Sequence, residues 1–104
     1  MAPHQFRLSP EASRDLVSIT RHIAAESGRT RAQAVAARIV RTIQALAFMP
    51  RMGVRWHVGG REMRRSTVAP WVIFYELMPD DSGIYVLRVA DGRRDLETLF
   101  ESED

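Results

Sequence analysis

The chain has 104 residues, of which 45% are apolar and 27% charged, so we expect one domain spanning residues 1–104. It contains no cysteine, which excludes disulfides and thiolate metal sites, and no apolar stretch approaches the roughly 20 residues of a membrane span. The start, Met1-Ala2-Pro3-His4-Gln5, lacks the basic and apolar regions of a secretory signal, so we expect a cytoplasmic protein.

The charge is distributed unevenly along the chain. Every basic residue other than histidine is arginine, and the net charge is only +2. Residues 1–80 hold 12 arginines against 6 acidic residues, whereas residues 81–104 hold 3 against 7. This asymmetry indicates an anionic partner for the main body, and either a nucleic acid or an acidic protein segment would satisfy it.

The first half of the chain predicts a strand followed by two helices. Residues 4–8 alternate as a strand does. Ser9-Pro10 then reads as a helix start, and Gly28 suits the position that ends this helix. Thr30 is expected to open a second helix that stops before Pro50. Such a short connection between two helices predicts an antiparallel hairpin.

The second half changes to the period of strands. Residues 51–60 are glycine-rich and are expected to form a loop, whereas residues 61–68, 71–77 and 84–90 are expected to form strands. The tail carries three apolar residues at helical spacing, Leu96, Leu99 and Phe100, which should cover one end of the sheet. The predicted fold is α+β, with an N-terminal strand and an antiparallel helical hairpin packed on an antiparallel β-sheet.

Metal and cofactor chemistry find no support in the residue pattern. His4, His22 and His57 are scattered without the paired spacing of metal ligands. The glycine patterns of phosphate and dinucleotide loops are missing, as is the serine elbow of hydrolases. We therefore expect neither a metal nor a cofactor.

An arginine-rich stretch is the first functional signal. Trp56 and His57 lie among five arginines that are candidates for contacting a target or partner: Arg51, Arg55, Arg61, Arg64 and Arg65. Arginines interleaved with an aromatic residue suit a nucleic acid or an acidic peptide. The alternative interpretation is an ordinary solvated loop and strand face.

Two acidic residues near arginines are candidates for proton transfer. RNA cleavage needs one group to take the 2′-hydroxyl proton and another to protonate the leaving oxygen. Glu62 is a candidate base and Asp91 a candidate acid, while Arg65 and Arg93 would only orient the phosphate, because arginine does not exchange protons at neutral pH. Both carboxylates are equally consistent with solvated salt bridges.

Three stretches together resemble the ParE/RelE toxin superfamily of type II toxin–antitoxin systems. They are Leu8-Ser9-Pro10-Glu11-Ala12 with Asp15-Leu16, Val72-Ile73-Phe74-Tyr75, and Leu87-Arg88-Val89 followed by Gly92-Arg93-Arg94-Asp95-Leu96. The resemblance covers roughly residues 6–100. It implies a RelE/ParE-like fold and a toxin that is neutralised by a cognate antitoxin. Such antitoxins often pair a ribbon-helix-helix dimer with an acidic tail, and only the antitoxin would contact operator DNA.

The resemblance leaves the toxic activity open. ParE-like members are associated with poisoning DNA gyrase, and RelE-like members cleave messenger RNA on the ribosome. Ribonuclease members often carry a histidine or tyrosine near the end of the last strand, where this chain has Asp91. The run from Gly92 to Asp95 favours the ParE-like branch, with Arg93 and Arg94 as further target contacts. A non-toxic binding module paired with an antitoxin is the other alternative.

Overall fold

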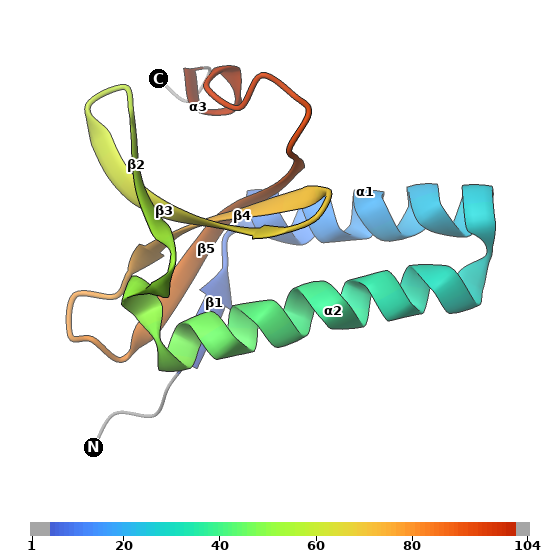
Figure 1. Ribbon diagram of the computed structural model, residues 1–104, viewed down its shortest axis with the longest axis horizontal. Coiled ribbons are helices and arrows are strands. Elements are labelled where there is room, and N and C mark those ends of the chain that lie inside the picture. The colour runs from blue at the N-terminus through green and yellow to red at the C-terminus, as the bar shows by residue number, and fades with distance from the viewer. Residues whose placement is uncertain (1–4, 102–104) are drawn as a thin grey trace.

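The computed structural model describes residues 5–101, which form a five-stranded sheet with a long helical hairpin against one face (Figure 1). His4, predicted to begin the first strand, lies outside the described residues. In chain order the elements are β1 (Gln5–Leu8), α1 (Pro10–Ser27), α2 (Arg29–Phe48), the 3-10 turn η1 (Pro50–Met52), β2 (Val54–Val58), β3 (Arg61–Val68), β4 (Trp71–Leu77), β5 (Gly83–Asp91) and α3 (Thr98–Glu101).

The predicted α+β class is confirmed, but the sheet is mixed rather than wholly antiparallel. Its strand order is β1-β5-β4-β3-β2, and β1 runs parallel to β5. The remaining pairs are antiparallel, as expected for strands joined by short turns. The helical hairpin returns the chain to the far side of the sheet, so β1 meets the last strand instead of its nearest neighbour in sequence.

The start of α1 is fixed by Ser9, as the sequence predicted. Its hydroxyl accepts a hydrogen bond from the backbone N–H of Ala12 at 2.9 Å, which caps the helix. The same hydroxyl donates to the carbonyl of Leu87 at 2.7 Å, and Ser9 is only 3% exposed. One buried serine therefore caps α1 and anchors it to β5.

The second helix begins earlier than the capping pattern of Thr30 predicted. Gly28 is the N-cap of α2, and no side chain caps this helix. The same glycine ends α1, since its N–H donates to the carbonyl of Ala24. Its φ of 93° lies in the left-handed region that favours glycine. A single glycine thus makes the whole turn, and Thr30 is left inside α2.

The expectation that residues 51–60 form a loop is wrong. This stretch contains η1, strand β2 and a two-residue turn at Gly59 and Gly60, both with positive φ. In β2, Trp56 and Val58 pack toward the core while Arg55 and His57 are exposed. The short alternation of β2 was outweighed by the flanking glycines Gly53, Gly59 and Gly60, and pairing with β3 makes it a strand.

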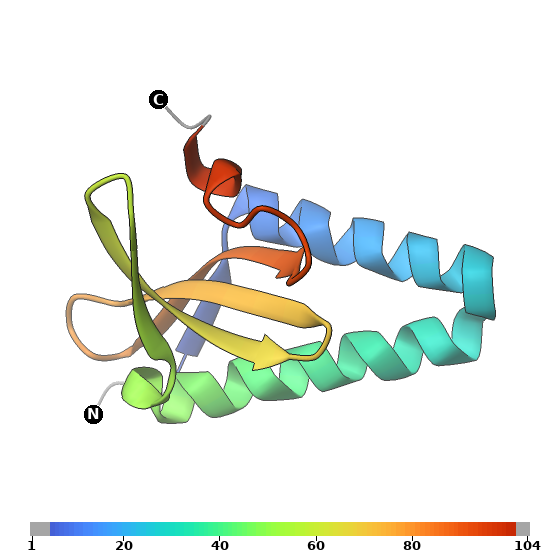
Figure 2. The same cartoon turned by 45° about the horizontal axis from the view of Figure 1, so that its top comes forward.

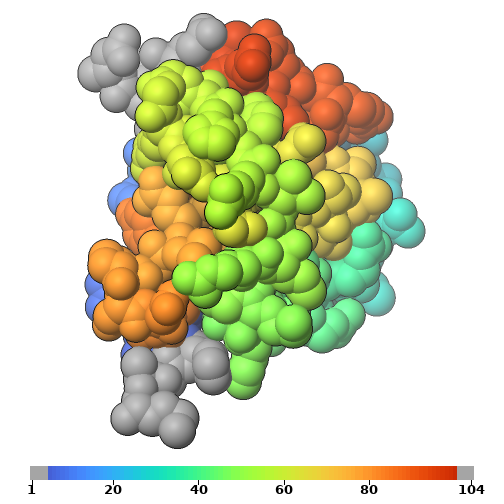
Figure 3. All heavy atoms as spheres, turned by 60° about the vertical axis from the view of Figure 1, so that its left-hand side comes forward, coloured from blue at the N-terminus to red at the C-terminus, as the bar shows by residue number. Residues whose placement is uncertain are grey.

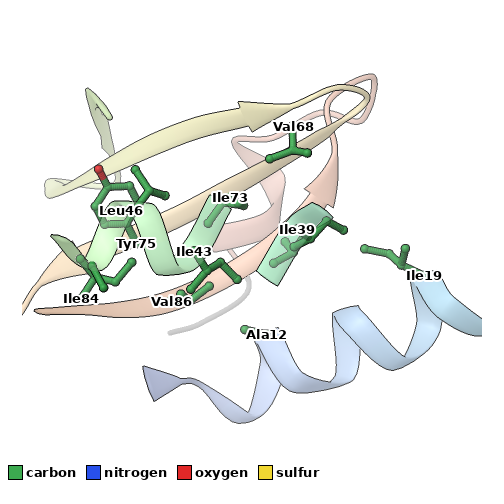
Figure 4. Close-up of a cluster of buried hydrophobic side chains, with 12 residues drawn as sticks. Ala12, Ile19, Ile39, Ile43, Leu46, Val68, Ile73, Tyr75, Ile84 and Val86 are labelled. Carbon is green, nitrogen blue, oxygen red and sulfur yellow. The ribbon is translucent and has the colours of Figure 1, made fainter. Parts of the chain in front are cut away.

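Each face of the sheet carries its own hydrophobic core. On one face α1 and α2 pack their apolar sides against β3, β4 and β5, with Ile39, Ile43 and Tyr75 fully buried (Figure 4). The other face is covered in part by α3, which lies across the sheet from the helical hairpin (Figure 2). Leu99 is 5% exposed there, so the tail covers the sheet as predicted, although on one face rather than at one end.

An ion pair that the sequence did not predict ties α1 to β5. The guanidinium of Arg88 donates to both carboxylate oxygens of Asp15, at 2.8 and 3.0 Å. The N–H of Val89 donates to the same carboxylate at 2.9 Å. Both side chains are mostly shielded from water, which strengthens such a paired contact. Asp15 and Arg88 occur in two of the stretches that resemble the toxin family.

Candidate functional site

The predicted arginine cluster lies on the β2–β3 hairpin and its neighbours. The β2–β3 hairpin and the β4–β5 loop lie side by side on one face of the molecule (Figure 3). A contact between Arg51 and Asp81, with 3.4 Å between guanidinium nitrogen and carboxylate oxygen, joins η1 to that loop. On β3, Arg61 donates to the carboxylate of Glu76 at 2.8 Å. The sheet thus brings these arginines close together, and neighbouring acidic residues form ion pairs with some of them.

Glu62 lies between two basic groups of β2. Its carboxylate oxygens are 3.5 Å from Nε of Arg55 and 3.6 Å from Nε2 of His57. His57 and Glu62 are directly opposite each other in the antiparallel register. All three side chains are exposed, so water screens these contacts. The arrangement offers a carboxylate and an imidazole within reach of one surface ligand.

Arg64 holds the backbone that joins α2 to β2. Its Nη1 donates to the carbonyls of Arg51 and Gly53, at 3.0 and 2.8 Å. From the neighbouring strand, the buried hydroxyl of Tyr75 accepts from the N–H of Gly53 at 2.9 Å and donates to the carbonyl of Pro50 at 2.7 Å. Burial raises the pKa of Tyr75, an effect that Gly53 and Arg64 partly offset. Arg64 and Tyr75 are therefore internal supports of this junction.

Gly53 is required at this junction for steric reasons. A Cβ at this position would run into the Tyr75 hydroxyl and lie 2.9 Å from the carbonyl oxygen of Arg65. The close approach lets the backbone N–H of Gly53 reach the tyrosine. The glycine that was read as a loop signal therefore permits a packed contact between η1 and the sheet.

Arg65 lies over an aromatic cluster on the α3 face. Its guanidinium carbon is 5.8 Å from the ring centroid of Trp56, within the range of a cation–π contact. Trp56 packs against Phe74 at 5.0 Å and Phe100 at 6.1 Å between ring centroids. The arginine and aromatic pattern seen in the sequence therefore reflects, in part, packing beneath α3.

Asp91 and Arg93 form a local pair at the end of β5. Arg93 donates to the carboxylate through Nη2 at 2.6 Å, Nε at 3.0 Å and its backbone N–H at 2.9 Å. These hydrogen bonds from Arg93 lower the pKa of Asp91 to about 2. The carboxylate is therefore ionised at neutral pH and holds no proton to give. Arg94 lies beside the pair with its side chain exposed.

The candidate base and the candidate acid are not brought together. Asp91 is opposite Trp71 on β4, and Trp71 is opposite Val68 on β3. Glu62 lies six positions from Val68 along β3, which is about 20 Å at roughly 3.3 Å per residue. The predicted catalytic set is therefore divided: Glu62 lies near one end of β3, and Asp91 and Arg93 lie at the opposite end of the sheet. Arg65 lies midway along β3, over Trp56.

The described residues show neither a metal-ligand cluster nor a membrane-spanning helix. Within residues 5–101, no three histidine or acidic side chains converge as a metal ion requires. None of the helices in the same range has the length and apolar character needed to cross a membrane.

The fold is that of toxins from type II toxin–antitoxin systems. A structure titled "Chromosomal ParDE TA system from P. aeruginosa" matches with TM-score 0.70 and 21% identity, covering 84% of this chain and 94% of that one. The toxin–antitoxin complex RelBE2 from Mycobacterium tuberculosis matches with TM-score 0.63 and 19% identity over 86% and 98% of the two chains. An archaeal RelE–RelB complex from Pyrococcus horikoshii OT3 gives 0.61 and 14% over 90% and 99%.

Comparison of the sequence with protein families identifies the family of the chain. The family described as "ParE toxin of type II toxin-antitoxin system, parDE" matches residues 6–96. The chain belongs to this ParE toxin family, within the ParE/RelE superfamily, and its resemblance to that superfamily is confirmed. No curated protein matches it in a sequence search.

Proposed function

We propose that this ParE-family toxin inhibits DNA gyrase, acts in the cytoplasm as one domain of residues 1–104, and is neutralised by a cognate antitoxin. The family match and the ParDE structure support the ParE-like branch. The observation that supports gyrase as the target is the separation of Glu62 from Asp91. RNA cleavage needs a general acid and a general base at one phosphate, whereas a gyrase inhibitor needs neither.

The exposed members of the arginine cluster and the two arginines that follow β5 are the proposed contacts with gyrase or the antitoxin. They are Arg51, Arg55 and Arg61 of the cluster, and Arg93 and Arg94 after β5. Arg64 and Arg65 belong to the same predicted set, but they also support the η1 junction and the aromatic cluster. Substitutions at these two positions would therefore mix a loss of binding with a loss of structure.

The proposed antitoxin is a ribbon-helix-helix protein with an acidic tail. All three structural relatives are named as toxin–antitoxin systems or complexes, which supports a protein partner. An acidic tail would complement the excess of arginine in residues 1–80. Operator DNA would be contacted through the antitoxin alone.

A ribosome-dependent messenger RNA endoribonuclease is the second candidate function. The observation that favours it is the position of Glu62 between Arg55 and His57. A carboxylate and an imidazole on one surface could share proton transfer without Asp91. In that case His57, rather than Asp91, would be the partner of Glu62.

One induction experiment separates these functions. Wild type, Glu62→Gln, Asp91→Asn and Arg93→Gln are induced, and plasmid supercoiling and messenger RNA ends are followed in parallel. A gyrase inhibitor should relax the plasmid, leave transcripts intact and keep most toxicity in both acid variants. Arg93→Gln should weaken target binding roughly 10- to 150-fold, the effect of losing one charge-assisted hydrogen bond.

Two controls test whether the expected effects are specific to the proposed contacts. Arg14→Gln removes the same charge from an exposed position on α1 outside the cluster and should keep full toxicity. Co-induction of the neighbouring gene product should restore growth. Early transcript cuts that vanish in Glu62→Gln, with supercoiling unchanged, would support the ribonuclease instead. A chain that binds the neighbouring product but never slows growth would be a non-toxic binding module.

A further inference from the structure

The arginines of the helical hairpin differ from those of the sheet in their partners. Several arginines around the sheet have carboxylate partners, as in Arg61 with Glu76 and Arg93 with Asp91, and Arg64 is bonded to backbone carbonyls. Residues 21–41 hold one acidic residue, Glu26, among five arginines, and no ion pair is seen for any of the five within the part of the chain that is described: Arg21, Arg29, Arg31, Arg38 and Arg41. The hairpin, which projects beyond the β3–β4 turn, therefore presents its positive charge to solvent (Figure 1).

Part of this charge lines a groove between the hairpin and the sheet. One hollow of about 270 Å³ is bounded by His22 of α1, Arg31 and Arg38 of α2, and Trp71 of β4. A second hollow of about 220 Å³ shares His22 and Trp71 and is closed by Arg94 after β5. We call the two adjoining hollows the hairpin groove. Trp71 lies where they meet, with arginines toward both ends.

The acidic residues of the groove are already compensated in part. Asp15 lines the second hollow but is paired with Arg88, and Asp91 is paired with Arg93. Glu26 is the one carboxylate that lines the first hollow, together with two arginines, Arg31 and Arg38. The groove therefore keeps a positive balance and favours an anionic occupant.

The backbone around the groove disfavours a peptide as that occupant. The carbonyl of Ala69 accepts from Arg38 at 2.8 Å, and the carbonyl of Pro70 accepts from the N–H of Gly92 at 2.8 Å. Proline has no N–H, the helices of the walls bond their backbone groups internally, and β4 and β5 pair with each other. A bound peptide would find few partners for its own buried N–H and C=O groups, which is costly.

We propose that the hairpin groove binds a single-stranded segment of nucleic acid, with Arg31 and Arg38 on its phosphates and Trp71 against a base. Guanidinium forks match phosphate oxygens, and a half-buried indole between positive charges is the usual platform for an unpaired base. Phosphates and base edges can remain hydrated on such a site, so it needs no backbone pairing. This activity lies beyond inhibition of gyrase and neutralisation by an antitoxin.

The test measures binding of the purified full chain to fluorescein-labelled oligothymidine and oligouridine of about 12 nucleotides, by fluorescence anisotropy. Binding should weaken with salt, and Arg31→Gln should weaken it roughly tenfold and reduce the salt slope by about 0.7. Arg41→Gln is the matched control, because it removes the same charge from the same helix outside the groove, and it should change binding less than twofold. Preference for either oligomer identifies DNA or RNA as the source.

Trp71 provides an independent readout. In a Trp56→Phe background, unlabelled oligomer should quench the emission of Trp71, and Trp71→Leu should weaken binding at least fivefold. If Trp71→Leu fails to fold, the quenching still decides. Equal weakening by Arg31→Gln and Arg41→Gln, or an emission that does not respond to saturating oligomer, would overturn the proposal. Tighter binding of a labelled poly-glutamate peptide with the same dependence on Arg31 would assign the groove to an acidic protein segment instead.

Discussion

Tyr75→Phe should destabilise the protein because one hydroxyl holds the junction between α2 and β2. The substitution removes the bond to the carbonyl of Pro50 and the bond from the N–H of Gly53. Leaving a buried backbone group without its partner costs about 1–3 kcal/mol. Since Pro50 is only half-buried, water can replace part of its loss, and we expect a total of about 2–4 kcal/mol. That is a large share of the roughly 5–15 kcal/mol of a typical domain.

Urea denaturation followed by circular dichroism measures this loss directly, and the melting temperature should fall by about 4–8 °C per kcal/mol. Tyr85→Phe is the matched control, since no hydrogen bond is seen for its hydroxyl among residues 5–101, and it should cost less than about 0.5 kcal/mol. A double-mutant cycle of Tyr75→Phe with Arg64→Gln should show coupling above about 0.5 kcal/mol, because both residues bind Gly53. A Tyr75→Phe protein as stable as wild type would refute the supporting role of the hydroxyl.

Truncation after Asp95 removes α3 and the contacts of Leu99 and Phe100, each worth about 1.5–3 kcal/mol of stability. The melting temperature should therefore drop markedly. An unchanged melting curve would contradict the packing of α3 on the sheet. Asp91 should titrate by NMR near pH 2, against an ordinary value of about 3.9, and Arg93→Gln should return its midpoint toward the ordinary value. Because the folded pKa is the lower one, the pair stabilises the fold above about pH 3.9, and that contribution is lost as the pH falls toward about 2. A wild-type midpoint near 3.9 would show that Arg93 does not bind this carboxylate in solution.

The helices and the inner strands were predictable from local pattern. Ser9 and Pro10 mark the start of α1, and Gly28 marks its end, because capping depends on groups within one turn of the chain. β4 is apolar on both sides, a pattern that is typical of a strand in the interior of a sheet. β2 is an edge strand of five residues between glycines, and those glycines favour a loop when only the local sequence is considered. Its extended form depends on pairing with β3.

The functional residues were recognised by type, whereas their grouping was not. The arginine cluster, Glu62 and Asp91 could be selected from the sequence because arginine and carboxylate chemistry is evident from residue identity. Strand register then determines that Glu62 and Asp91 lie at opposite ends of the sheet. The sequence does not predict the hairpin groove, because no local signal connects Arg31 on α2 with Trp71 on β4.

The sequence by itself determined the fold class, the boundaries of α1 and the family, because these follow from signals between residues close in the chain and from the order of short motifs. Only the tertiary structure decided that β1 runs parallel to β5, that Asp15 binds Arg88, and which arginines have carboxylate partners. Asp15 and Arg88 are 73 positions apart in the chain. Whether such groups meet depends on how the two cores pack the helices and the sheet together. A local sequence pattern cannot predict a contact between residues so far apart in the chain.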